Sequence, residues 1–361
     1  MLSLVGALRG LLKIKPVHID GMTFRLHHGP TVVLLLAFSV LITTKQYFGD
    51  PIDCDVSGGA PKSLINVYCW IHATYSVTSL FRSADGVEVV YPGVGTWKGS
   101  PPKYGSQEGE YKFHKYYQWV SLMLFFQAIL FYAPRWLWKA WEARRLENLL
   151  SEREPQRIAK AIWADTFSNY MYRYALCELL CFINVFAQFF IMNRFLDGEF
   201  LTFGWDVLRF LDESPEDRID PMIRVFPRVA KCHFHKFGSS GNVETHDAVC
   251  VLPLNIVNEK VYVFLWFWMC VLCAVTVCTI LYRILQLFSG SDLRARLIKL
   301  RFYYVPDVFL AAQECTSGQC FILYMLGRNM ETLTFTEVLQ ELQAQQTKAP
   351  GYEKVAVDEK V

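Results

Sequence analysis

Charged residues are scarce in this chain of 361 residues. Asp, Glu, Lys and Arg make up 19% of it, whereas 53% is hydrophobic and 15% aromatic. Soluble globular domains carry about a quarter charged residues. Charge is lacking altogether from two long runs, 116–132 and 261–282. Because the apolar residues are also concentrated in blocks, the composition indicates a protein that spans a membrane.

The sequence also lacks the local motifs of common catalytic sites. It contains no G-x-S-x-G elbow, no H-E-x-x-H helix and no phosphate-binding glycine loop. Its eight histidines are scattered, apart from the adjacent pair His27 and His28. The two halves do not resemble each other, which argues against a transporter built from inverted repeats. We therefore expect no enzyme, no cofactor, no resident metal and no nucleic-acid partner.

Four apolar blocks can be compared with the roughly 20 residues that cross about 30 Å of hydrocarbon as a helix. We expect spans at 26–45, 114–133, 174–192 and 260–282. The expected fold is an all-α membrane protein, a bundle of four transmembrane helices in contact with lipid. The segments between and beside the spans are 1–25, 46–113, 134–173, 193–259 and 283–361.

The distribution of Lys and Arg predicts which segments face the cytoplasm. The middle loop, 134–173, holds 8 basic and 5 acidic residues, whereas the two long loops hold 5 against 7 and 7 against 11. Basic residues close to the spans favour the cytoplasmic side. We therefore expect a multi-pass plasma-membrane protein with both termini inside and the two long loops outside.

The first residues, "MLSLVGALRGLLKIK", do not have the pattern of a secretory signal. No basic residue precedes their apolar part, Arg9 interrupts it, and no convincing small-residue cleavage site follows. We expect a retained amphipathic segment. A helix lying on the membrane interface is the alternative.

Four of the eleven cysteines lie in the two outward loops: Cys54, Cys69, Cys232 and Cys250. Together with His235 and His246, Cys232 and Cys250 also show a spacing close to that of a tetrahedral zinc site. An oxidising compartment favours two disulfides instead, and the sequence alone leaves three pairings open. Around "GSSGN" at 238–242 the pattern predicts a small β-hairpin.

These features converge on a resemblance to the innexins, the invertebrate gap-junction proteins. It is most specific at "YYQWV", which is Tyr116, Tyr117, Gln118, Trp119 and Val120. It continues with "FRLHHGPTV" at 24–32, "QYFGDPIDC" at 46–54, "LFYAPRWLWK" at 130–139 and "DPMIRVFPRVAKCHFHKFGSSG" at 220–241.

Two places depart from the family pattern. The residues "EARR" at 142–145 stand where Glu-Gly-Gly is common, and Gln319 and Cys320 stand where the family often has Asp-Trp. Gating and regulation by a helical cytoplasmic dome are therefore the properties that the resemblance carries over least well.

The resemblance implies an octameric ring of four-helix subunits around a wide pore. The ring would be a homo-octamer, with hetero-oligomers as a further possibility, and two such hemichannels in neighbouring cells would dock through the outward loops. The resemblance also implies that Cys54 pairs with Cys250 and that Cys69 pairs with Cys232. The first span and the N-terminus would line the pore.

The first span has a polar face of its own. Thr31, Ser39, Thr43 and Gln46 are separated by steps that stay on one side of a helix, and lipid offers their polar groups no partner. The alternative is that the hydroxyls bond to carbonyls within the helix. The residues expected to line the pore are Met1, Leu2, Leu4, Val5, Arg9, Ser39, Thr43 and Gln46.

The third span contains one acid, Glu178. An ionised carboxylate there costs at least about 2.5 kcal/mol on insertion scales, so it should face protein or water. It would either bond to a neighbouring helix or take part in conduction.

In the tail, the basic stretch 292–302 would lie on the inner leaflet or in the cytoplasmic dome. The stretch 334–346 predicts a further helix.

Three function classes fit these features. The first is a gap-junction channel that passes ions and small metabolites between cells. The second is an unpaired plasma-membrane hemichannel that releases metabolites, as in the related pannexins. The third is a four-span adhesion protein, which would explain the loops and disulfides but not the polar face of the first span.

Overall fold

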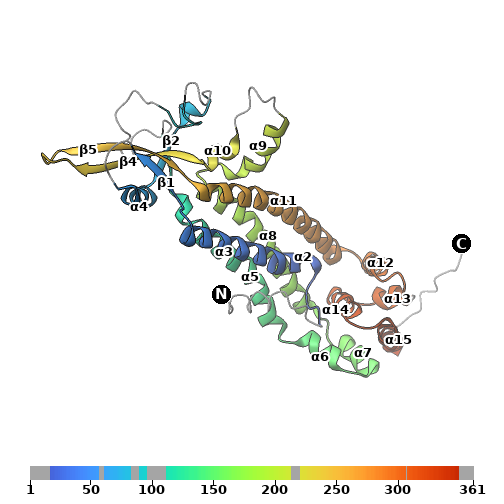
Figure 1. The fold of residues 1–361 in the computed structure, drawn as a ribbon. Helices are drawn as coiled ribbons and strands as arrows, with labels where there is room; N and C mark the ends of the chain where they lie inside the picture. The colour runs from blue at the N-terminus through green and yellow to red at the C-terminus, as the bar shows by residue number, and fades with distance from the viewer. Residues whose placement is uncertain are drawn as a thin grey trace. The chain divides into compact units, whose positions relative to one another are not determined.

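The computed structural model describes residues 17–56, 61–82, 89–95, 111–212, 220–305 and 307–348. Within them, four helical stretches are long and apolar enough to cross a membrane (Figure 1). The first, Met22–Phe48, joins α2 (Met22–Leu26), a π-helical stretch at His27–Thr31 and α3 (Val32–Phe48). The others are α5 (Val120–Glu142), α8 (Ser168–Phe195) and α11 (Pro253–Phe288). The prediction of four apolar spanning helices is confirmed.

The second of these helices begins later than hydropathy suggests. Residues 114–119 belong to the expected span, but the structure has β3 (Tyr111–His114) and then a 3-10 turn at Tyr116–Gln118 before α5 begins. Tyr116 and Tyr117 are buried among protein side chains. Hydropathy counts such aromatic residues as lipid-facing, because it does not distinguish burial in protein from burial in a bilayer.

The chain divides into two compact units, and the division falls within each spanning helix. The terminal unit comprises Met1–Val32, Leu130–Asn184 and Leu272–Val361, and the loop unit comprises Val33–Ile129 and Val185–Val271. The terminal unit therefore contains both ends of the chain, and the loop unit contains both long loops.

A five-stranded antiparallel sheet forms the centre of the loop unit, with the strand order β1-β5-β4-β2-β3. Its strands are β1 (Asp53–Val56), β2 (Thr74–Val77), β3, β4 (Val229–Phe237) and β5 (Val243–Val251). The predicted hairpin at 238–242 is confirmed as the β4–β5 connection, where Gly241 has the positive φ of +81° that favours glycine. The sheet is larger than the predicted hairpin, because the first loop adds three strands to β4 and β5.

Three helices accompany this sheet: α4 (Lys62–His72), α9 (Phe200–Asp212) and α10 (Pro221–Val225). The helix α4 buries Ile65 and Cys69 against the sheet, in a cluster that includes Ala230, Phe234 and Ala248. Buried residues of both loops thus share one small core.

The terminal unit is helical. Its shorter helices are α6 (Arg145–Ser151), α7 (Pro155–Ala164), α12 (Ser291–Arg301), α13 (Val308–Gln313), α14 (Ser317–Gly327) and α15 (Thr332–Lys348). The helix predicted at 334–346 is confirmed as α15. The basic stretch 292–302 forms α12, which buries Ala295 and Ile298 in the core of this unit and so agrees with the interpretation as a dome helix. The helix α14 lies at the centre, since most of its side chains are buried.

Candidate functional site

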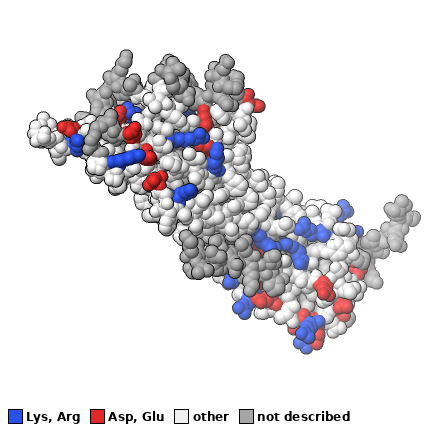
Figure 2. Space-filling view, viewed as in Figure 1, with Lys and Arg blue, Asp and Glu red and all other residues white. Residues whose placement is uncertain are grey.

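The outer surface of the spanning helices is apolar. On α5, Leu122, Phe125, Phe126 and Ile129 are each about half exposed. In Figure 2 the charged side chains lie over the loops and over the tail, while the spanning helices show almost none. Exposed apolar surface of this extent marks an interaction site, and helices of this length and composition match a lipid bilayer.

Two disulfides join the two long loops. Cys54 of β1 bonds to Cys250 of β5, and Cys69 of α4 bonds to Cys232 of β4. These are the pairs that the innexin resemblance implies. Cys54 and Cys250 stand directly opposite each other in the antiparallel register. All four cysteines are buried, so the bonds lie inside the shared core of the loops.

The disulfides exclude the zinc site that the spacing of Cys232, His235, His246 and Cys250 suggested, because both of these cysteines are already bonded. The sulfur atoms of Cys54, Cys69 and Cys250 lie within 4.8 Å of one another, as they would around a metal, but all three are oxidised in disulfides and supply no thiolate. His235 instead contacts the Thr245 hydroxyl at 3.1 Å across the hairpin. His246 lies 3.7 Å from Glu244.

The "YYQWV" stretch connects these loops to the start of α5. The Tyr116 hydroxyl donates to the carbonyl of Val225 at 2.9 Å, and that of Tyr117 donates to the carbonyl of Cys69 at 3.3 Å. Tyr117 also stacks on Trp70 with ring centroids 4.6 Å apart. These residues therefore anchor a spanning helix to one disulfide-bearing helix of the first loop and to α10 of the second.

The rest of the stretch continues this anchor. Gln118 donates to the carbonyl of Trp70, and Val120 is fully buried where α5 begins. Trp119 is the exception, with 60% of its surface exposed.

On the first span, the predicted polar face is turned mostly toward the protein itself. Thr31 is buried, and its hydroxyl donates to the carbonyl of Leu26 at 2.8 Å. Ser39 is only 8% exposed, and its hydroxyl donates to the carbonyl of Ser121 on α5 at 2.8 Å. Thr43 and Gln46 are half-buried. The Thr31 hydroxyl thus follows the alternative of a bond within its own helix. The Ser39 hydroxyl follows neither interpretation, because its partner lies on a neighbouring helix.

The other side of α3 is the exposed one. Ala37, Val40, Leu41 and Thr44 are exposed in the subunit, and Thr44 bonds back to the carbonyl of Val40 at 2.8 Å. The other residues expected to line the pore, Met1, Leu2, Leu4, Val5 and Arg9, lie outside the described residues.

Glu178 of α8 forms a two-pronged ion pair with Arg283 of α11. The guanidinium donates from Nε to Oε2 at 2.8 Å and from Nη2 to Oε1 at 3.0 Å. Both side chains are at least nine-tenths buried. Arg283 also lies 5.3 Å from the ring of Tyr174 and 5.0 Å from that of Phe321. The geometry favours the interpretation of Glu178 as a helix-to-helix contact.

Sequence reasoning missed the burial of another acid, Glu259, which it placed in the second loop. Glu259 lies inside α11 with a fully buried side chain, and Arg228 and Lys260 contact its carboxylate at 3.0 Å and 2.8 Å. The only available signal was its position one residue before Lys260, next to the apolar run.

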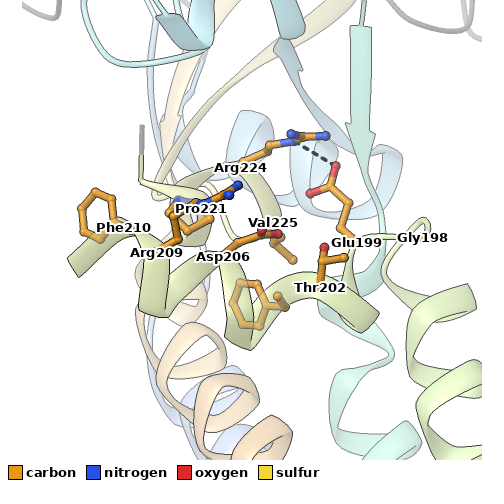
Figure 3. A pocket seen from close by; sticks show the side chains of 10 residues that line it. Gly198, Glu199, Thr202, Asp206, Arg209, Phe210, Pro221, Arg224 and Val225 are labelled. Carbon is orange, nitrogen blue, oxygen red and sulfur yellow. Dashed lines mark hydrogen bonds and ion pairs between the residues drawn. The ribbon is translucent and has the colours of Figure 1, made fainter. Parts of the chain in front are cut away.

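A cavity of about 480 Å³ lies between α9 and α10 in the loop unit (Figure 3). Glu199 lies at its edge and contacts Arg224 at 3.1 Å and Lys112 at 2.9 Å, so its charge is balanced.

Comparison with known proteins agrees with this architecture. The innexin family model matches residues 20–346. The chain is 45% identical to innexin shaking-B of Drosophila melanogaster, over 95% of this chain and 94% of that protein. It is 44% identical to innexin inx2 of Schistocerca americana, over 95% and 97%, and 35% identical to innexin inx4 of Anopheles gambiae, over 98% and 93%. The chain belongs to the innexin family and is a gap-junction channel subunit.

Proposed function

We propose that this subunit assembles into an octameric ring, and that two rings in neighbouring cells dock through their long loops. The resulting channel would pass ions and small metabolites directly between the cells. Both termini and the middle loop would lie in the cytoplasm, and the two long loops would lie outside.

The observation that carries the proposal is the covalent union of the two long loops. Disulfides join segments that are 196 and 163 residues apart, and strands from both loops form one sheet. Disulfides persist in oxidising, extracellular surroundings. A rigid, disulfide-held surface suits a contact that must be made repeatedly around a ring, because little conformational entropy is then lost on docking.

We propose further that the N-terminal segment and the first span line the pore. The exposed side of α3, with Ala37, Val40 and Thr44, is the part of this helix that remains available to a lumen or a neighbouring subunit. Ser39 would then support this face through its bond to α5. Thr43 and Gln46, which are half-buried, would lie at its margin.

The test is electrical. Two apposed cells that express the chain are both voltage-clamped, and the junctional current is compared with the membrane current of a single expressing cell. We expect a junctional current that is lost when Cys54 and Cys250 are both replaced by serine. A matched control replaces the buried cytoplasmic-tail cysteine Cys315 by serine, which leaves both disulfides intact.

Each alternative outcome has a distinct meaning. Current across the single-cell membrane alone would show an unpaired release channel. Absence of both currents, with the protein present at the surface, would favour adhesion or an obligate second subunit. A junctional current that survives the double cysteine replacement would overturn the role proposed for the disulfide-held loops.

A further inference from the structure

The residues just before the first span, Val17 to Gly21, form an irregular segment with bends at Val17 and Asp20, here called the strap. Val17 and Ile19 pack against the core of the terminal unit. The backbone groups of the strap bond to side chains from three other parts of this unit. A buried backbone needs such partners, so the surrounding side chains determine where the strap lies.

Asn329, which follows α14, makes the strongest of these contacts. Its Oδ1 accepts from the backbone nitrogen of His18 at 2.6 Å, and its Nδ2 donates to the backbone carbonyl of His18 at 2.9 Å. The same Nδ2 reaches the carbonyl of Met325 at 2.8 Å, within α14. One side-chain amide thus pairs with both polar groups of one residue, as a neighbouring strand would.

Further contacts hold the rest of the strap. Arg328 donates to the carbonyl of Asp20 at 3.2 Å, and Trp138 of α5 donates from Nε1 to the carbonyl of Ile19 at 3.0 Å. The backbone nitrogen of Gly21 donates to the hydroxyl of Tyr174 on α8 at 2.7 Å.

The side chain of Asp20 adds an ionic contact. It accepts from Arg135 at 2.6 Å and lies 2.8 Å from His28. Burial opposes its charge, but the hydrogen bond with His28 and the positive charge of Arg135 outweigh this effect and hold the pKa of Asp20 below its usual value. The carboxylate is therefore ionised at neutral pH and keeps these contacts.

The strap connects the tail to the first span, which is proposed to line the pore. It leads directly into α2, where that span begins. Arg328 and Asn329 come from the tail, where Asn329 is fixed to α14 by bonds from its backbone nitrogen and its side chain to Leu326 and Met325. A displacement of the tail would therefore move the start of the first span.

We propose that Asn329 is a positioning residue that couples the tail to the start of the first span, and so sets the balance between open and closed channels. The inference rests on the proposed function. It differs from a merely stabilising role, because it predicts a change in gating in channels that reach the membrane in normal amounts.

The experiment uses full-length channels in paired cells. Asn329→Ala removes both bonds to His18, whereas Asn329→Asp keeps an acceptor and loses the donor. Loss of one or two hydrogen bonds should change the open-to-closed ratio roughly threefold to tenfold. We expect this change in the open-to-closed ratio to shift the dependence of junctional conductance on transjunctional voltage, and the shift should be larger for Asn329→Ala than for Asn329→Asp. The amount of protein at the surface and the assembly of the ring are measured on the same cells.

Two controls follow from the geometry. His18→Ala leaves both backbone bonds in place and should keep the wild-type voltage dependence. Asn148→Ala changes an exposed asparagine on α6 of the same unit and should do the same. If Asn329→Ala does not reach the membrane, the variants Trp138→Phe and Tyr174→Phe test the inference instead. Each of them removes one hydrogen bond to the strap and keeps an aromatic ring at its position.

Unchanged voltage dependence in the Asn329 variants, at any surface amount, would overturn the inference. If neither Asn329 variant conducts, unchanged voltage dependence in both Trp138→Phe and Tyr174→Phe would do the same. A wild-type chain without junctional current would instead contradict the proposed function, so the two failures are distinguishable.

Discussion

At the scale of single residues, the buried ion pair shows what a local sequence pattern can and cannot predict. The position of Glu178 inside an apolar run predicts that it faces protein or water. Its partner, Arg283, lies 105 residues away at the end of the last apolar run, where the sequence assigns it to the tail. Nothing local links the two, since their contact depends on how α8 and α11 pack.

Removing the acid should be more damaging than removing the pair. Glu178→Gln leaves the Arg283 guanidinium buried without a counter-charge, which costs about 3–5 kcal/mol for a buried pair, whereas replacing both by apolar residues of similar size is often neutral. We therefore expect Glu178→Gln to lower the thermal stability of the purified protein clearly. The double variant Glu178→Leu, Arg283→Met should recover most of that loss.

Size-exclusion chromatography after heating measures both effects. Equal stability of Glu178→Gln and the wild type would show that the pair is not a structural contact. If Glu178→Gln channels conduct with unchanged selectivity, a role of this carboxylate in conduction is removed as well.

The departure from the family pattern at Gln319 also has a local explanation. Gln319 completes a capping box with Thr316 at the start of α14: its side chain accepts from the Thr316 nitrogen at 2.9 Å, and the Thr316 hydroxyl accepts from the Gln319 nitrogen. The side-chain nitrogen Nε2 of Gln319 also donates to the carbonyl of Ile162 at 3.0 Å. An aspartate has no donor for that second contact, so this residue suits the chain's own packing between α7 and α14.

At the scale of elements, hydrophobic runs predict the spanning helices because each run satisfies its own backbone hydrogen bonds within one segment. The sheet was predictable only at the hairpin, where turn residues lie between adjacent strands. The strands β1, β2 and β3 have four residues each, too few for a clear alternation. β1 also pairs with β5, a strand nearly 200 residues later in the chain, and local sequence patterns do not predict such a pairing.

The turn between α5 and α6 contains backbone strain at two residues that are not glycine. Ala143 and Arg144 have φ values of +47° and +62°, in the region where a non-glycine residue costs roughly 1–2 kcal/mol. They belong to "EARR", which stands where Glu-Gly-Gly is common in the family. The carboxylate of Glu142 holds the turn by accepting from the nitrogens of Arg144 and Leu146, both at 2.8 Å.

Glycine should therefore stabilise this turn. We expect the double variant Ala143→Gly, Arg144→Gly to raise the free energy of unfolding by about 1 kcal/mol, since relief of strain exceeds the extra backbone entropy of glycine in the unfolded chain. Arg145→Gly, at the first residue of α6, has no positive φ to relieve and should not raise it. Denaturation of the purified protein measures both changes, and destabilisation by the double variant would contradict the strain argument.

At the scale of the whole molecule, the distribution of basic residues predicts the sidedness of the chain, which fits the separation of its long loops from its termini into different units. An epitope tag added after Val361 should react with antibody only in permeabilised cells. A tag placed within residues 213–219 of the second loop should react on intact cells. Labelling of the C-terminal tag on intact cells would overturn the proposed orientation.

The long sequence separation of the disulfides also constrains how the protein is made. With the long loops outside, as proposed, Cys54 and Cys69 would enter the oxidising compartment well before their partners Cys250 and Cys232, which follow 196 and 163 residues later. At about 5–20 residues per second, the ribosome needs roughly ten to forty seconds to supply these partners. During that interval the first loop would hold two thiols whose correct partners are not yet made, so a chaperone or an isomerase would have a defined period in which to prevent a wrong pairing.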